Sequence, residues 1–132
     1  MIRVAAAAAL AMSAAALAGC EGGGLAAPTE RGACWHLVTP RDGGPQRFNR
    51  VAQNVPTLED CAARLEAIRM RFSGLGMRQD QLTGAYQGQF LFLRRPGIYT
   101  GARIDDRGYL ALVRTGDGRL AQPGAVRQPA AN

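Results

Sequence analysis

The chain has 132 residues, a length that limits it to one small domain with a modest hydrophobic core. It carries 16 basic residues, all of them arginine, against 10 acidic residues, so its formal net charge is +6. The arginines are scattered, with Arg94-Arg95 as the longest run, which is typical of a solvated surface. No phosphate-binding loop, nucleophile elbow or metalloprotease motif occurs, so the sequence predicts no catalytic residue, no metal site and no cofactor.

The first 19 residues have the pattern of a secretory signal peptide. Arg3 places a positive charge near the amino end, and the uncharged segment VAAAAALAMSAAALAG follows it. This apolar run is shorter than the roughly 20 residues that a permanent membrane-spanning helix needs. We therefore expect residues 1–19 to be a cleaved leader, and an alanine-rich helix that stays attached is the alternative.

The leader ends in Leu17-Ala18-Gly19-Cys20. This segment resembles the lipobox of bacterial lipoproteins, in which a leucine and two small residues precede a cysteine. The resemblance covers residues 1–20 and implies that the Cys20 thiol receives a diacylglycerol. It also implies that a peptidase cuts before Cys20 and that the new amino group is often acylated, for example with palmitate. Each buried methylene contributes about 0.8 kcal/mol, so two or three acyl chains would give an essentially permanent anchor.

An anchor of this kind implies a location and a set of partners. The protein would face the periplasm from a lipid membrane, where nucleic acid is not an expected partner. Glu21 stands where enterobacterial lipoproteins retained in the inner membrane tend to have Asp, so the outer membrane is favoured. The expected partners are the membrane itself, other envelope proteins, and anionic envelope polymers attracted by the basic chain.

The domain boundaries follow from composition. Residues 20–32 contain EGGGLAAPTERG, which predicts an acylated anchor followed by a flexible tether with a mean reach of about 20 Å. Residues 33–120 form the predicted domain. Residues 121–132 are small, polar and interrupted by proline, so we expect a disordered tail.

Two cysteines, Cys34 and Cys61, remain once Cys20 is acylated. In an exported protein an even number of cysteines favours a disulfide, and with two thiols the pairing is forced. Such a crosslink would contribute about 3–4 kcal/mol by restricting the unfolded chain. One alternative is a metal site that uses Cys34, His36 and Cys61, but it lacks a fourth ligand. The other is a nucleophile pair of Cys34 with His36, which share one face of a strand but have no evident third orienting group.

The first half of the domain predicts two strands and a helix. CWHLVT alternates like a strand, PRDGGP supplies a turn, and QRFNRVAQNV offers a short second strand. Thr57 is a good N-cap, and Glu59 and Asp60 suit the first turn of a helix that SGLG ends. The apolar positions step by three and four residues and predict one buried stripe, which contains Leu58, Cys61, Leu65, Ile68 and Phe72.

The second half predicts about three more strands. GAYQGQFLFLRR is expected to be one long strand, with Phe90 and Phe92 on one face. RPG is a turn, and IYTGARI and YLALVRT flank the hairpin connection DDRG. Asp105 and Asp106 therefore mark the tip of a hairpin rather than an acid–base pair. The predicted fold is α+β, with one helix packed on a small antiparallel sheet.

A ligand face is the last feature the sequence suggests. Trp35 and Tyr86 could stack on a sugar ring, and Gln87 and Gln89 would share one side of a strand near the basic pair Arg94 and Arg95. Core packing of the aromatic residues and an ordinary solvated strand face are the alternatives that the sequence favours. The sequence as a whole predicts a lipid-anchored envelope protein whose domain is a binding or structural module and not an enzyme. A small periplasmic enzyme or enzyme inhibitor centred on Cys34 and His36 is the alternative.

Overall fold

The structure, a computed structural model, describes residues 24–76 and 81–124. The predicted leader, the lipobox with Cys20, and the predicted tail from residue 125 onward lie outside the described residues.

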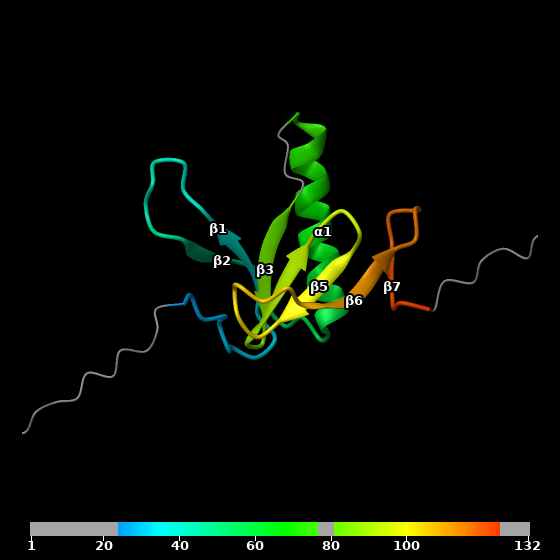
Figure 1. Ribbon diagram of the computed structural model, residues 1–132, viewed down its shortest axis with the longest axis horizontal. Coiled ribbons are helices and arrows are strands. Elements are labelled where there is room, and N and C mark those ends of the chain that lie inside the picture. The colour runs from blue at the N-terminus through cyan, green and yellow to red at the C-terminus, as the bar shows by residue number, and fades with distance from the viewer. Residues whose placement is uncertain (1–23, 77–80, 125–132) are drawn as a thin grey trace, which may run out of the picture.

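One helix and seven strands make up the described part of the chain (Figure 1). The sheet has the order β2-β1-β3-β4-β5-β6-β7, and each neighbouring pair is antiparallel. The chain passes through α1 between β2 and β3, which brings β3 next to β1. In chain order the elements are β1 (Cys34–Val38), β2 (Arg47–Ala52), α1 (Leu58–Gly74), β3 (Leu82–Tyr86), β4 (Gln89–Leu93), β5 (Ile98–Gly101), β6 (Tyr109–Arg114) and β7 (Leu120–Ala121).

The predicted α+β class is confirmed, as is the start of the domain with two strands and a helix. The number of later strands is larger than predicted, because five strands follow α1 instead of about three. The last of them, β7, includes Ala121, which the composition places in the predicted tail. The strand β7 has two residues and pairs with the end of β6 after a turn at residues 115–119. This pairing extends the domain by one residue past its predicted end at residue 120.

The predicted long strand over residues 84–95 is wrong. It is a hairpin in which β3 and β4 are joined by Gln87 and Gly88, with φ angles of 47° and 81°. Two successive positive φ values are the mark of the tight turn whose twist suits a two-residue hairpin. Asn-Gly is the usual sequence signal for such a turn, and a glutamine with positive φ is uncommon. The sequence therefore gave little local indication that the strand reverses at this point.

Helix α1 begins as predicted. The Thr57 side chain accepts a hydrogen bond from the Asp60 backbone N–H at 3.1 Å, and Glu59 and Asp60 occupy the first turn. Cys61 and Leu65 of the predicted stripe are fully buried, and Ala62 joins them. Glycine fills the facing position of β3, because a Cβ at Gly84 would lie 2.3 Å from Leu65 Cδ1. Close approach between helix and sheet thus depends on residue 84 having no side chain.

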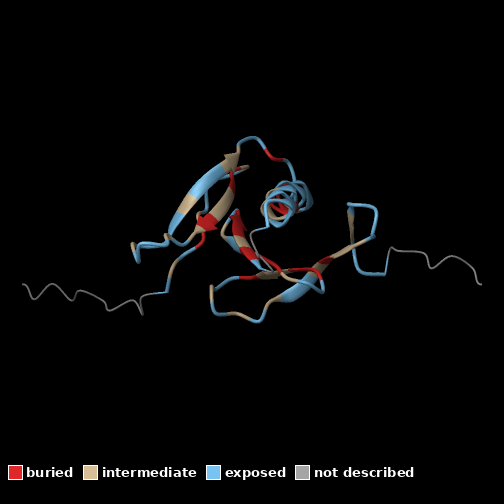
Figure 2. Cartoon of the chain, turned by 90° about the horizontal axis from the view of Figure 1, so that it is seen from above, coloured by how far each residue is buried: buried red, intermediate tan, exposed pale blue. Residues whose placement is uncertain are grey.

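The sheet buries hydrophobic side chains on both of its faces. The larger cluster lies between the helix and the strands that curve around it (Figure 2) and includes Cys34, Leu65, Leu91, Ile98 and Leu112. A second, smaller cluster is made by Ala27, Ala85, Phe90 and Phe92, with Trp35, Phe48, Tyr99 and Ile104 packed against it. Because side chains alternate along a strand, Ala85 and Phe90 point away from the face that Gly84 and Leu91 present to α1. The face opposite α1 therefore carries this second cluster, which we call the aromatic face.

The described part of the predicted tether is packed against the domain, which corrects the prediction for residues 24–32. Ala27 is only 8% exposed and belongs to the aromatic face. The Gly88 N–H donates to the Pro28 carbonyl at 2.8 Å, and the Val55 N–H donates to the Gly32 carbonyl at 2.9 Å. Composition alone indicated a flexible segment, whereas these contacts with residues far along the chain fix its position.

Candidate functional site

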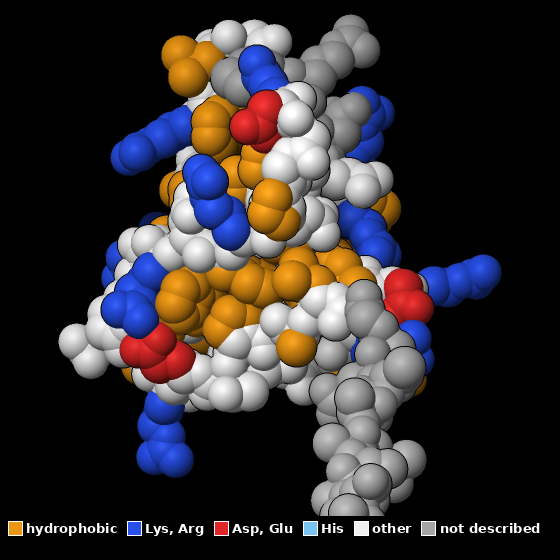
Figure 3. All heavy atoms as spheres, turned by 90° about the vertical axis from the view of Figure 1, so that its left-hand side faces the viewer, with side chains coloured by type: hydrophobic (Ala, Val, Ile, Leu, Met, Phe, Trp, Pro, Cys, Tyr) orange, Lys and Arg blue, Asp and Glu red, His pale blue; other side chains and the backbone are white. Residues whose placement is uncertain are grey.

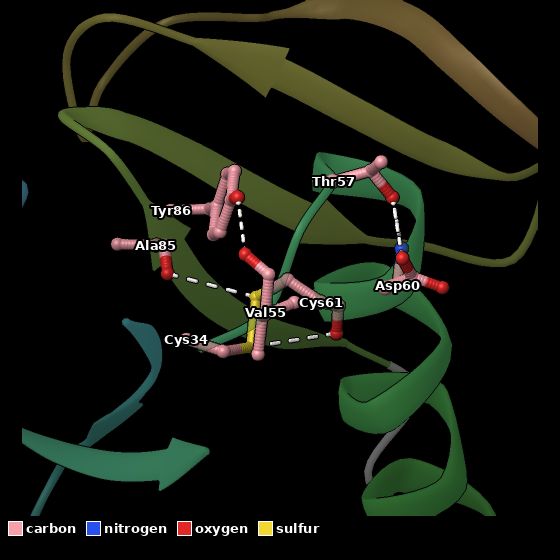
Figure 4. Close-up of a disulfide and its surroundings, with 7 residues drawn as sticks. All are labelled: Cys34, Val55, Thr57, Asp60, Cys61, Ala85 and Tyr86. Carbon is pink, nitrogen blue, oxygen red and sulfur yellow. Dashed lines mark hydrogen bonds between the residues drawn. A yellow bond between two sulfur atoms is a disulfide. The ribbon is translucent and has the colours of Figure 1, made fainter. Parts of the chain in front are cut away.

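The disulfide between Cys34 and Cys61 joins β1 to α1 in the centre of the larger cluster (Figure 4). Both cysteines are fully buried. The carbonyl oxygens of Cys61 and Ala85 lie 3.5 and 3.8 Å from the two sulfurs. These are contacts and not hydrogen bonds, because a disulfide sulfur carries no proton. The predicted disulfide is thus present, and neither sulfur is a thiolate that could attack a substrate or bind a metal.

His36 follows Cys34 by two residues on β1, and the two side chains share one face of the strand as predicted. Burial lowers the pKa of His36, which favours a neutral imidazole at pH 7. His36 lines a surface depression of about 590 Å³ at the end of the sheet that β1 and β3 share. Polar side chains at this depression include Thr39, Gln46 and Asn49, and Gln46 Nε2 donates to Thr39 Oγ1 at 3.0 Å. A half-buried neutral imidazole among these side chains can bind a polar group, and neither Cys34 nor Cys61 is available to it as a nucleophile.

The residues of the predicted ligand face are not brought together. Tyr86 is 4% exposed and its hydroxyl donates to the Val55 carbonyl at 2.7 Å, so it is a core residue (Figure 4). Gln87 lies in the β3–β4 turn, where its Oε1 accepts from the Gly32 N–H at 3.3 Å, and it does not share a strand face with Gln89. Gln89 begins β4 and Arg94 follows its other end, which places their Cα atoms about 17 Å apart along the strand.

Trp35 and Arg94 are the members of that prediction that lie at the aromatic face, where arginines cover three of the aromatic rings. The Arg50 guanidinium lies 4.9 Å from the Trp35 ring and forms an ion pair with Glu30 at 2.5 Å. The Arg94 guanidinium lies 5.0 Å from the rings of both Phe92 and Tyr99. Such stacking is a favourable cation–π contact that also shields the rings from water.

This face is still partly accessible. Its outer residues, Trp35, Phe48, Tyr99 and Ile104, are half-buried. Figure 3 shows one side of the molecule, on which hydrophobic side chains gather across the middle, with arginine and acidic side chains at the margins. The indole N–H of Trp35 is buried and has no hydrogen-bond partner among the described residues. The aromatic face therefore combines half-buried aromatic rings with two guanidinium groups, one of which is paired with Glu30.

A cluster of charged residues that no sequence pattern predicts lies between α1 and β6. Glu66 is only 5% exposed and receives two hydrogen bonds each from Arg69 and Arg114, at 2.6–3.0 Å. Arg114 also donates to the carbonyls of Arg94 and Arg95, at 2.7 and 2.9 Å. Burial acts to raise the pKa of Glu66, but the hydrogen bonds and charges of Arg69 and Arg114 outweigh it and lower that pKa to about 2.

The Glu66 cluster is a structural link and not a reactive group. A carboxylate held ionised by two arginines has neither a proton to give nor basicity to accept one near pH 7. Arg114 ties α1 to β6 and to the β4–β5 turn in one set of contacts. The signal in the sequence was an acidic residue beside the apolar stripe of α1, but its partner Arg114 lies 48 residues away.

Two further features concern the residues that the structure describes, 24–76 and 81–124. No group of three or more histidine, cysteine, aspartate or glutamate side chains could hold a metal ion in this part of the chain. Helix α1, the one helix among the described residues, is not long and apolar enough to span a membrane. No protein-family model, no curated protein and no solved structure matches the chain.

Proposed function

We propose that this protein is a lipid-anchored protein of the bacterial cell envelope whose domain serves as a small binding or structural module. The anchor is the thiol of Cys20, the mature chain begins at that residue, and the domain faces the periplasm, with the outer membrane as the favoured location. The domain carries out no chemical reaction of its own.

The observation that carries this proposal is the way in which the three cysteines of the chain are paired. Cys34 and Cys61 are bonded to each other in the core, so Cys20 has no cysteine of the same chain left to pair with. A disulfide of this kind is typical of exported proteins. Cys20 directly follows an apolar leader, and the other two cysteines of the chain form a disulfide. Both features support acylation of Cys20.

The anchor is tested by metabolic labelling with an acyl-chain probe in the producing bacterium. The wild-type protein should carry the label and sediment with the membrane fraction, and Cys20→Ala should lose both. Ser13→Ala is a matched control, because it changes one small residue of the same leader outside the lipobox. An unlabelled wild-type protein, or equal labelling of Cys20→Ala, would overturn the anchor.

The binding role has its own test. The described residues and the full chain are both rich in arginine, and two of those arginines border a hydrophobic surface. We expect the protein to be retained on isolated anionic envelope polymers, with retention that decreases as salt is raised. If no polymer retains the protein at any salt concentration, the domain is a structural module, and crosslinking followed by partner identification would find the envelope proteins it contacts.

A further inference from the structure

We infer that the aromatic face, at the place where the chain leaves the domain, is turned toward the phospholipid headgroups, so that helix α1 faces away from the membrane. This inference rests on the proposed acylation of Cys20. It goes beyond that proposal because it assigns which surface of the domain lies against the lipid and which surface is left for other partners.

The first step is the position at which the described chain begins. Gly24, Leu25 and Ala26 line a surface depression of about 540 Å³ together with residues 102–105 of the β5–β6 loop. Immediately after them, Ala27 is buried on the aromatic face. The chain therefore enters the domain on the side of the sheet opposite α1 (Figures 1 and 2).

The second step is the length of chain between this entry point and the anchor. Residues 21–23 alone separate Cys20 from Gly24, so the distance between the Cα atoms of Cys20 and Gly24 is at most about 14 Å. A tether that ran to residue 32 would have a mean reach of about 20 Å and would let the domain turn freely. The packing of residues 27–32 removes that freedom.

The third step compares this distance with the size of the domain. A domain of about 100 residues has a radius of gyration of about 13 Å, so a path around it to the α1 side is about 40 Å long. A tether of at most about 14 Å cannot make that path. An acylated Cys20 therefore holds the surface around Gly24 next to the lipid, and the exposed side of α1 is directed into the periplasm.

The chemistry of the exit surface suits the headgroup region. Leu25 and Ile104 are half-buried apolar residues, and Ala26 and Ala102 are small and exposed. Arg103 is paired with Asp105 at 3.0 Å, but both side chains are largely exposed. An exposed ion pair of this kind contributes little, so the guanidinium can exchange its partner for a lipid phosphate.

The test uses the full acylated protein in vesicles of phosphatidylethanolamine and phosphatidylglycerol, in which a fraction of the lipids carries a headgroup-attached quencher. Ala102→Cys and Ala67→Cys each introduce one thiol for a fluorescent label. Both alanines are exposed. Ala102 lies beside Gly24 at the exit surface, whereas Ala67 lies on α1, on the other side of the sheet. The helix alone is about 10 Å across, so the two labels are well separated. We expect loss of most of the fluorescence at position 102 and retention of it at position 67.

The control for tether length is a flexible glycine-serine insert between Gly23 and Gly24. Its reach should equal the path around the domain, about 40 Å. It should keep the protein on the vesicles and remove the difference between the two labels. Equal quenching at positions 102 and 67 in the anchored protein without the insert would overturn the orientation alone. A wild-type protein without an acyl group, which does not float with vesicles, would overturn the proposed function and this inference with it.

Discussion

At the scale of single residues, Gly84 shows how one missing side chain sets the distance between helix and sheet. A Cβ added there would lie 2.3 Å from Leu65 Cδ1 and 2.5 Å from the Trp35 carbonyl oxygen. The methyl group of Leu65 can rotate away, but the carbonyl belongs to the neighbouring strand and cannot. We expect Gly84→Ala to lower the free energy of unfolding by about 1–3 kcal/mol in urea denaturation, as overpacked core positions do.

Gly74 is the matched control for this substitution. It ends α1, and a Cβ added there would meet nothing within 4 Å. Gly74→Ala should leave the stability unchanged or raise it by up to about 1 kcal/mol, because alanine loses less backbone entropy than glycine on entering a helix. If the two variants have equal stability, the close approach at Gly84 does not limit packing.

Glu66 is the residue whose ionisation we expect to affect stability most. Its folded-state pKa of about 2 lies below the ordinary value of 4.5. The ionised carboxylate therefore contributes stability that is fully present above pH 4.5 and is lost as the pH falls from 4.5 toward 2. The difference between the two pKa values corresponds to about 3 kcal/mol.

The test replaces the carboxylate with an amide. Glu66→Gln should lower the free energy of unfolding by about 3 kcal/mol at pH 7, because two arginines lose their buried charge partner. The variant should also change less in stability between pH 4.5 and pH 2 than the wild type does. Glu59→Gln changes an exposed glutamate in the first turn of the same helix and is the control, which should lose no more than about 1 kcal/mol at pH 7. An unaltered pH dependence in Glu66→Gln would contradict the role assigned to this group.

Sequence reasoning identified residues with local signals and missed those defined by distant contacts. Thr57 was predicted as an N-cap because the signal lies within four residues of the helix start, and Cys34 with Cys61 was predicted as a disulfide because no other pairing remained. Glu66 and Gly84 depend on Arg114 and Leu65, which only the folded chain brings to them. No periodicity or spacing indicates such contacts.

At the scale of elements, the disulfide fixes α1 to β1 across 27 residues of sequence. Replacing both cysteines with alanine should lower the free energy of unfolding by about 3–4 kcal/mol, since the unfolded chain regains the freedom of that closed loop. Differential scanning calorimetry of the domain measures the loss. Cys20→Ala, which leaves the disulfide intact, should unfold at the wild-type temperature, and a double variant that does so as well would show that the crosslink adds nothing.

Helix α1 was predicted more accurately than the strands, for a physical reason. Helix α1 has a capping signal, an apolar stripe and glycines at its end, so three independent features agree. β3 and β4 read as one strand because the turn between them contains Gln87, which lacks the usual turn chemistry, and because apolar residues continue on both sides of it. Strand ends set by pairing are similarly hard to predict, and β5 ends at Gly101 rather than at Ile104.

At the scale of the whole molecule, the aromatic face explains why residues before the predicted domain start are ordered. A seven-stranded sheet with one helix has a second face that the helix cannot cover. Phe90 is fully buried there, with Ala27 and the side chains of Phe48 and Tyr99 packed around it. The segment that composition assigned to a tether thus completes the hydrophobic core.

We expect this segment to be required for stability. A chain that begins at residue 33 loses the Pro28 and Gly32 carbonyls as acceptors for Gly88 and Val55, together with the cover over the aromatic face. Two backbone hydrogen bonds at about 1 kcal/mol each give an expected loss of about 2 kcal/mol relative to a chain that begins at residue 24. The protein has one tryptophan, Trp35, which packs against this face, so its fluorescence reports both the unfolding transition and local exposure.

The comparison of chain starts also tests the premise of the proposed membrane orientation. If the chain from residue 24 is as stable as the chain from residue 20, and the chain from residue 33 is less stable with a red-shifted Trp35 emission, the packed segment belongs to the domain and the free tether is short. If the chains from residues 24 and 33 have equal stability and equal emission, residues 24–32 are not held against the sheet. The domain would then turn freely on a long tether, and no single face of it would be presented to the lipid.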